Sequence, residues 1–237
     1  KALEAKKRLL GRLQQVLAQR STERGGLDLL SGGLDEAGIP LSDDDLVEQL
    51  LLLLFAGYET TASSLSCLMR ALLLNPDMEQ WLLPELLDQS WPNLDGRSCP
   101  RLDATVLEVM RLTPPVGGFF RKTKDTVQLG DVEIPEDRVI QVALSPNLGD
   151  GSCDLADIRP QRHLDGSFTQ TLLPFGGGGR VCLGKALAEL EIRLMAVGLL
   201  QRVRLELAPD QGLTLQQIPS PSPRGGLLVT ASTRDRS

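Results

Sequence analysis

Histidine and closely spaced cysteines are scarce in this sequence. The 237 residues include one histidine, His163, and four cysteines that are far apart and form no C-x-x-C pair. Zinc sites and most non-haem iron sites draw on several histidines or on paired cysteines, so this composition excludes most of them. The spacing also predicts no disulfide framework and favours a reducing, cytoplasmic location. A single cysteine remains available as a metal ligand.

Basic blocks and long apolar runs are also missing. The net charge is -6, aromatic residues make up 3% of the chain, and no basic block is interleaved with aromatics, so we expect no nucleic-acid partner. The densest apolar run, 50–56, is far shorter than the roughly 20 residues of a membrane-spanning helix, so we expect no membrane span. A hydrophobic content of 41% is enough for the core of a single domain over 1–237.

The spacing of apolar residues predicts a mainly α-helical protein with a small β region. We expect helices over 1–20, 43–74, 78–88, 102–112 and 185–200, and short strands within 118–145 and 201–230, with irregular chain over 146–172. Ser42, which precedes three aspartates, predicts an N-cap for the second helix. The chain begins inside a helical pattern without a methionine, so we expect a polypeptide truncated at its N-terminus.

The stretch F-G-G-G-G-R-V-C-L-G over 175–184 places Cys182 directly before a predicted helix. Glycines there allow a tight turn that directs backbone N–H groups at an anion. Two anions fit this arrangement. One is a phosphate, and the other is the thiolate of Cys182 itself, which a helix N-terminus and a cation such as Arg180 stabilise.

The phosphate interpretation rests on a match to the nucleotide-binding pattern G-x-x-x-x-G-K over 179–185. That pattern requires Ser or Thr at the next position to hold magnesium, and Ala186 stands there. Pro174 also interrupts the position where a central strand should precede the loop. Both departures count against a nucleotide site.

The thiolate interpretation gives more of the residues a role, because cysteine thiolate is an established axial ligand of haem iron. Gly178 and Gly184 would allow the turn and the close approach of a flat macrocycle. Phe175 would pack beside the sulfur, and Arg180 would neutralise a propionate. A buried structural cysteine in a glycine-rich turn is the simpler alternative while the loop is considered by itself.

Two further motifs precede the loop. The sequence A-G-x-E-T-T over 56–61 interrupts a leucine-rich predicted helix, and its glycine and threonines provide a place where the backbone can distort. A tolerated glycine in a buried helix is the alternative. Glu108 and Arg111 lie three residues apart on one helical face, a spacing that by itself favours an exposed pair contributing a few tenths of a kcal/mol.

In this order, the three motifs resemble the C-terminal half of a cytochrome P450. They correspond to the family's cysteine-ligand loop, F-x-x-G-x-R-x-C-x-G, its oxygen-activation motif and its E-x-x-R helix. The segments 53–57, 114–118 and 172–178 are most similar to the retinoic-acid hydroxylases and their bacterial relatives. The resemblance implies a cytochrome P450 fold, truncated at the N-terminus, with 1–237 forming the C-terminal haem-binding portion of one domain.

The resemblance implies that the chain binds haem b and that Cys182 is the metal ligand. The residues implied in cofactor binding are Phe175, Gly178, Arg180, Cys182, Gly184 and Arg121. Glu59 and Thr60 would form the catalytic pair that delivers protons for the activation of dioxygen, as a carboxylate beside a hydroxyl can do through water. The segment 116–119 would line the substrate pocket.

The resemblance also implies that Glu108 and Arg111 join Arg162 in a buried ion cluster that braces the cysteine loop. This expectation differs from the exposed position that their spacing alone favours. The family's Pro-Glu-Arg-Phe segment is here Pro-Gln-Arg-His over 160–163. The arginine is retained, but its altered neighbours leave the local packing open.

The function implied by the family is that of a monooxygenase that inserts one oxygen atom of O2 into a small apolar substrate, such as a retinoid, a terpenoid or a fatty acid. Electrons would come from a separate ferredoxin or reductase. The alternative is a non-enzymatic or degenerate haem-binding fragment, because the helices that cover the distal face in relatives have no counterpart before Lys1. A P-loop-like nucleotide binder is the third interpretation.

Overall fold

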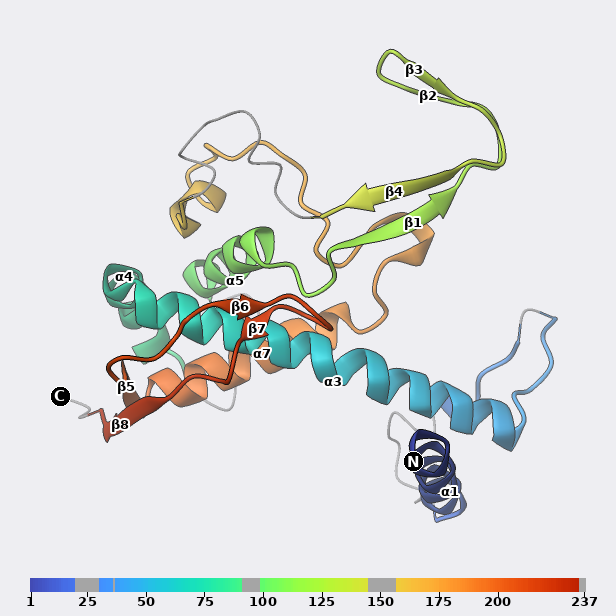
Figure 1. Cartoon of the computed structure of the whole chain (residues 1–237), viewed down its shortest axis with the longest axis horizontal. Coiled ribbons are helices and arrows are strands. Elements are labelled where there is room, and N and C mark those ends of the chain that lie inside the picture. Colours follow the sequence, from blue (N-terminus) through green and yellow to red (C-terminus); the bar gives the residue numbers. More distant parts are fainter. Residues whose placement is uncertain (20–29, 36, 91–98, 145–156, 235–237) are drawn as a thin grey trace. The chain divides into compact units, whose positions relative to one another are not determined.

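Helices make up most of the regular structure of the chain. The computed structural model describes residues 1–19, 30–35, 37–90, 99–144 and 157–234. Its helices are α1 (Ala2–Ala18), α3 (Asp43–Leu74), α4 (Pro76–Leu87), α5 (Pro100–Leu112) and α7 (Lys185–Leu200), with short 3-10 turns η1 (Pro160–His163) and η2 (Gly178–Arg180) (Figure 1). The predicted mainly α-helical class is therefore confirmed.

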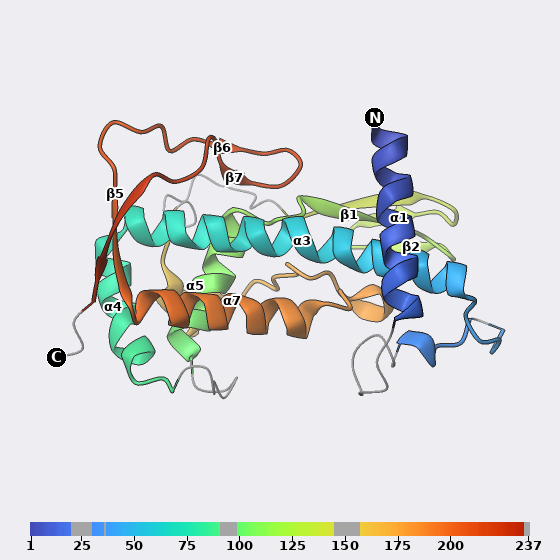
Figure 2. The ribbon, with the colours of Figure 1, turned by 90° about the horizontal axis from the view of Figure 1, so that it is seen from below.

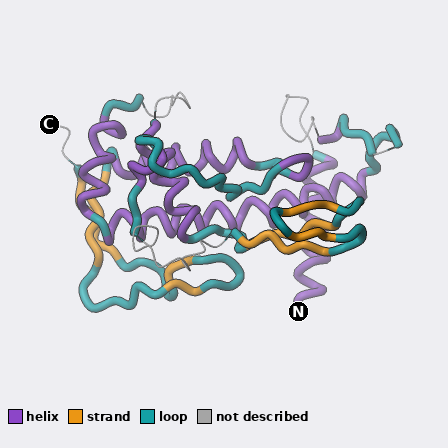
Figure 3. Tube along the Cα trace, turned by 90° about the horizontal axis from the view of Figure 1, so that it is seen from above, coloured by secondary structure: helices purple, strands orange, loops and turns teal. Residues whose placement is uncertain are grey.

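The strands form separate antiparallel pairs. These pairs are β1 (Gly118–Lys122) with β4 (Val139–Ala143), β2 (Val127–Leu129) with β3 (Val132–Ile134), β5 (Val203–Leu207) with β8 (Val229–Thr233), and β6 (Leu215–Gln216) with β7 (Ser222–Pro223). Figure 3 shows β1–β4 gathered in one group and β5–β8 in another. Both predicted strand regions are confirmed. Part of the predicted irregular stretch, 146–156, lies outside the described residues, as does position 145 at the end of the first predicted strand region.

Proline and an N-capping serine mark where three of the helices begin. Helices α4 and α5 begin two residues before their predicted starts, at Pro76 and Pro100. Proline suits the first turn of a helix because its missing N–H needs no partner there. Helix α3 has its predicted bounds and begins with a capping box, in which the hydroxyl oxygen of Ser42 accepts the N–H of Asp45 at 3.2 Å and the Asp45 carboxylate accepts the N–H of Ser42 at 3.1 Å.

The chain divides into two compact units, residues 1–58 and 59–237, and the boundary falls within α3. In the first unit, α1 and the beginning of α3 pack through a small apolar cluster of Leu13, Leu17, Leu46 and Val47. In the second unit, α4, α5, α7 and the rest of α3 lie together (Figure 2) and share one core. Its most buried side chains include Leu68, Leu82, Leu86, Leu102 and Ile192. The single domain expected over 1–237 stays a prediction.

Helix α7, which follows the cysteine loop, is tied to its neighbours by polar contacts. Arg193 forms a two-point ion pair with Asp103 of α5, with N–O distances of 2.6 and 3.0 Å. At the end of α7, the side-chain amide of Gln201 donates to the carbonyl oxygens of Leu86 and Gln89, at 2.7 and 2.8 Å. These contacts fix α7 against α4 and α5. The loop 175–184 therefore ends at a helix whose position is fixed.

Helix α3 is long and apolar enough to cross a membrane by length and composition, with a mean hydropathy of 1.3 over its most apolar window. A mostly buried core helix of a soluble protein passes the same test. Here 17% of that window is buried, and Leu68 and Leu72 of α3 belong to the core of the second unit. The expectation that the chain has no membrane span therefore stays a prediction.

Candidate functional site

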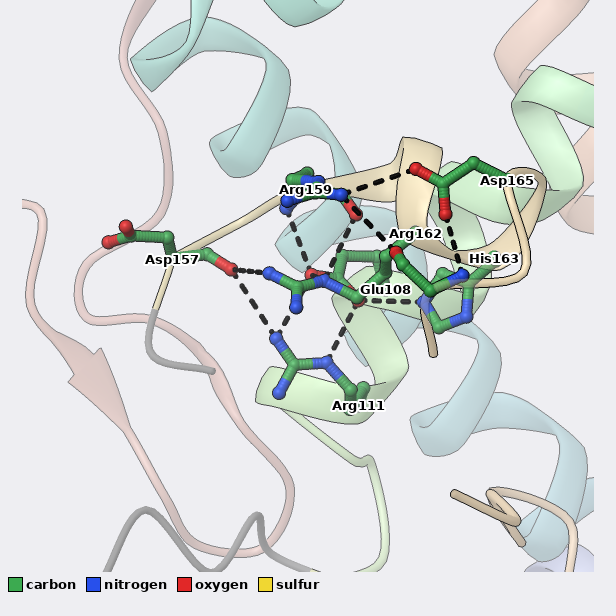
Figure 4. Close-up of polar contacts among 8 residues, drawn as sticks. Glu108, Arg111, Asp157, Arg159, Arg162, His163 and Asp165 are labelled. Atoms are coloured by element: carbon green, nitrogen blue, oxygen red, sulfur yellow. Dashed lines mark hydrogen bonds and ion pairs between the residues drawn. The ribbon is translucent and has the colours of Figure 1, made fainter. Parts of the chain in front are cut away.

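A buried carboxylate, Glu108 of α5, lies at the centre of a polar cluster (Figure 4). Its Oε1 accepts hydrogen bonds from Nε of Arg162 at 3.1 Å and from the backbone N–H of Arg159 at 2.9 Å. The guanidinium of Arg111 bridges the two oxygens, at 2.9 Å from Oε1 and 2.8 Å from Oε2. Oε2 also lies 2.7 Å from Nε2 of His163. The cluster therefore joins α5 to the segment that contains η1.

The charge of Glu108 follows from these contacts. Burial by itself raises the pKa of a carboxyl group, but hydrogen bonds from His163 and Arg111 and from a backbone N–H outweigh that effect and lower the pKa of Glu108 to about 2. The buried position of Glu108 and Arg111 confirms what the family resemblance implies and corrects the exposed position that spacing alone favours. The reason is Arg162, a partner 54 residues further along the chain that local spacing does not contain.

His163 is a member of the cluster that the sequence did not assign. Its side chain is 6% exposed and packs edge-on against Phe168, with ring centroids 5.1 Å apart and an interplanar angle of 64°. The family pattern has phenylalanine at this position. The sequence feature that could have indicated His163 is this replacement of an apolar ring by a polar one, next to the retained Arg162.

The loop before α7 is held by its own backbone. The N–H of Cys182 donates to the carbonyl oxygen of Phe175 at 2.9 Å, and the N–H of Lys185 donates to the carbonyl oxygen of Cys182 at 3.3 Å. Between them, Gly178 has a φ of +67°, a conformation that costs an L residue free energy. The turn thus brings Phe175 and Cys182 together and leaves Cys182 at the start of α7.

The described cysteines differ sharply in exposure. Cys67 and Cys99 are 3% and 0% exposed, and burial raises the pKa of the Cys67 thiol. Cys182 is exposed, and all three are free thiols. Cys153 lies outside the described residues. Among the cysteines that the structure describes, Cys182 is therefore the one that can reach a ligand at the surface.

Glu59 and Thr60 are half-buried on α3. The hydroxyl of Ser64 donates to the carbonyl oxygen of Thr60 at 3.0 Å, so a side chain does engage the backbone here. Helix α3 is helical at every residue from 55 to 61, so the structure agrees with the alternative of a tolerated glycine and shows no distorted backbone at this motif. One glycine costs about 1 kcal/mol of helix propensity, which the hydrogen bonds of a long helix outweigh.

The two arginines that the sequence assigns to cofactor binding, Arg121 and Arg180, differ in the contacts that they make. Arg121 lies on β1, where its guanidinium donates to the carbonyl oxygen of Phe120 at 2.9 Å and stacks 4.3 Å from the ring centroid of Phe119. Arg180 is exposed at the end of η2. Arg121 therefore has protein partners of its own, whereas Arg180 belongs to the cysteine loop.

The family model for cytochrome P450 matches residues 4–232. The chain belongs to the cytochrome P450 family. Cytochrome P450 120 of Synechocystis is 35% identical over 244 residues, which cover 97% of this chain and 55% of that protein. Cytochrome P450 26B1 of Rattus norvegicus is 33% identical over 227 residues, covering 86% of this chain and 43% of that protein.

A solved structure gives the same result. Retinoic-acid-bound cyanobacterial CYP120A1 matches with a TM-score of 0.84 at 33% identity, over 98% of this chain and 57% of that one. These findings confirm the predicted P450 fold and the resemblance to bacterial relatives. The chain spans about half the length of the curated relatives it matches.

The exposed side chains of the loop fit the haem that cytochromes P450 bind. Val181, Leu183 and Leu187 are 50%, 89% and 60% exposed around Cys182. Apolar side chains of this size usually lie inside a protein, so together they offer an apolar surface to a flat macrocycle. The sulfur of Cys182 and the nearby cation Arg180 are the kinds of group that a haem-thiolate site would need. The described residues contain no group of three or more His, Cys, Asp or Glu that could hold a metal ion.

The nucleotide-binding interpretation finds no support. Residues 172–174 form no strand, and the amino group of Lys185 lies 5.9 Å from the ring centroid of Phe175 and 3.9 Å from a carboxylate oxygen of Glu189. The missing strand before the loop counts against a nucleotide site.

Gly178→Ala should destabilise the fold by about 1 kcal/mol, because alanine must adopt a positive φ there. A Cβ at position 178 would meet no atom within 4 Å, so the cost comes from the backbone alone. Gly179→Ala is the matched control, since its Cβ also meets nothing and its φ is not in that region. Urea unfolding measures both variants, and equal stabilities would contradict the assigned backbone conformation.

Glu108→Gln should lower the free energy of unfolding at neutral pH by about 3 to 5 kcal/mol, because it leaves buried arginines without their counter-charge. The pKa of Glu108 is lowered from 4.5 to about 2, so its contribution is complete above about pH 4.5 and is lost as the pH falls toward 2. The wild-type stability should therefore fall more steeply than that of the variant in this window.

Urea unfolding at several pH values measures this difference. Glu133→Gln, at an exposed position on β3, is the control and should follow the wild type. Parallel curves for the wild type and Glu108→Gln would show that the carboxylate is not held in its ionised form.

Proposed function

We propose that this chain is the haem-binding C-terminal portion of a monooxygenase that inserts one oxygen atom of O2 into a small apolar substrate. The observation that carries the proposal is the exposed Cys182, presented at the end of a hydrogen-bonded turn in a member of the cytochrome P450 family. Haem bound there supplies the activation of dioxygen.

Cys182 is the proposed metal ligand. Its backbone bond to Phe175 and its position just before α7 hold Cys182 at one place. Arg180 is the proposed propionate partner, and Arg121 is proposed as a second one. Gly184, where a Cβ would lie 4.0 Å from the sulfur, keeps space open beside the ligand.

Glu59 and Thr60 are the proposed proton-transfer pair. A carboxylate can take up a proton from water, and a neighbouring hydroxyl can donate one proton while it accepts another. Their half-buried positions on α3 support this role, because such groups contact both solvent and the protein interior. The helix holds the two side chains in a fixed relation along its surface.

The substrate class rests on the relatives. One solved relative carries retinoic acid, which supports a retinoid, or a similar terpenoid or fatty acid, as the substrate. Electrons would arrive from a separate ferredoxin or reductase. A cytoplasmic location without a membrane span is supported by the similarity to a cyanobacterial protein and by the packing of Leu68 and Leu72 of α3 in the protein core.

The alternative is a chain that binds haem without enzymatic activity. Incorporation of labelled oxygen from O2 into an apolar test substrate separates the two functions. Haem binding with no incorporation, under conditions where electrons are supplied, would favour the alternative.

Loading the chain with haem should give, after reduction under carbon monoxide, the red-shifted Soret band of a thiolate-ligated iron. Cys182→Ala removes the sulfur and Cys182→Ser replaces it with a weaker donor, so both should abolish that band. Exposed Leu87→Ala on α4 is a control that should leave the spectrum unchanged. A thiolate band that persists in Cys182→Ala would refute the ligand assignment.

Thr60→Ala should divert electrons to peroxide, because water entering without a positioned hydroxyl supplies protons less selectively. Peroxide formed per electron, measured in haem-loaded protein supplied with a redox partner, should rise several-fold, and Thr60→Ser should restore much of the coupling. Ser66→Ala removes a hydroxyl that is bonded to the Ala62 carbonyl at 2.7 Å on the same helix and serves as the control. Unchanged peroxide yields in Thr60→Ala would exclude Thr60 from proton delivery.

A further inference from the structure

We infer that His163 is a positioning residue that fixes the Glu108 carboxylate and thereby holds the segment 157–168 against α5. The inference starts from the contact of 2.7 Å between Nε2 of His163 and Oε2 of Glu108, both in side chains that are almost wholly buried. This role is separate from the proposed oxygen chemistry, because it concerns the fold of the segment that leads to the cysteine loop.

The hydrogen-bonding capacity of Glu108 determines where the proton of this contact lies. Glu108 is ionised because its pKa is lowered to about 2, and an ionised carboxylate can only accept hydrogen bonds. Nε2 of His163 must therefore carry a hydrogen and donate it to Oε2. Hydrogen bonds to a buried carboxylate are among the strong ones because one partner is charged and water is excluded.

The donors are divided between the two oxygens of Glu108. The segment supplies the guanidinium of Arg162 and the N–H of Arg159 to Oε1, and it supplies His163 to Oε2. Arg111 of α5 already bridges both oxygens and fixes the orientation of the carboxylate. His163 adds a bond to Oε2 that comes from the segment 157–168, so the segment itself is attached to both oxygens.

The rest of the segment is built around the same residues. The carbonyl oxygen of Asp157 accepts hydrogen bonds from Arg162 at 3.1 Å and from Arg111 at 3.4 Å. Phe168 contacts the ring of His163, and its own ring lies 5.9 Å from the guanidinium of Arg111. The beginning and the end of the segment thus contact the side chains that bind Glu108. A phenylalanine at position 163 would preserve the ring contact while removing the donor.

Nitrogen-15 NMR of the imidazole tests the proton assignment in the unmodified chain. His163 is the only histidine in the sequence, so one set of ring signals belongs to it without further assignment. At mildly alkaline pH we expect Nε2 to carry the hydrogen and to exchange it slowly with water. A neutral ring with its hydrogen on Nδ1 and a bare Nε2 would overturn the inference, and this measurement needs no variant that must fold.

Hydrogen exchange of the backbone amides over 157–168 tests the positioning role. His163→Phe should raise their exchange rates about tenfold, whereas His163→Gln, which keeps an N–H donor, should stay within about twofold of the wild type. Lys122→Gln is the matched control, because it removes an exposed ion pair, with Asp137 at 2.6 Å, that lies outside the measured segment, and it should leave the exchange rates unchanged. Equal rates in His163→Phe and the wild type, or rates in His163→Gln as high as in His163→Phe, would overturn the inference.

Discussion

The rest of the site depends on the burial of one negative charge. A carboxylate removed from water is unfavourable unless donors replace its hydration, and removing any partner leaves a charge uncompensated. Glu108 meets this requirement with side chains from its own helix and with donors from the segment 157–168, 54 residues further along the chain in the case of Arg162. The need to satisfy this carboxylate therefore determines where that segment can lie.

The cysteine loop is held from both sides by α5. On its N-terminal side, the segment of Arg162 and His163 is bound to Glu108. On its C-terminal side, helix α7 is bound to Asp103 through Arg193. Both attachments lie on one helix, so the loop between them is constrained although its own side chains are largely exposed. A ligand atom can in this way be accessible and still have a fixed position.

The helices and the family could be predicted from the sequence, because both depend on residues close together in the chain. Apolar periodicity predicted the helices, because each side chain reports which face of its own element is buried, and the three motifs identified the family. The exposed position that spacing favoured for Glu108 was wrong, since its burial depends on Arg162, a partner distant in sequence. The bond of His163 to Glu108 could not be predicted either, because one histidine in a retained segment does not indicate which buried acceptor lies opposite it.

The residues that hold the segment 157–168 in place differ from the residue that is proposed to bind iron. The buried charges of the Glu108 cluster are fully engaged by one another and by backbone groups, so they position the segment and are not available to react. Cys182 has the opposite character, since its neighbours Val181 and Leu183 are exposed and its backbone, not its sulfur, carries the hydrogen bonds that fix it. A lone cysteine in a glycine-rich turn has no assigned role by itself. The structure around Cys182 hydrogen-bonds its backbone and leaves the residue exposed, which is the arrangement that the proposed ligand role requires.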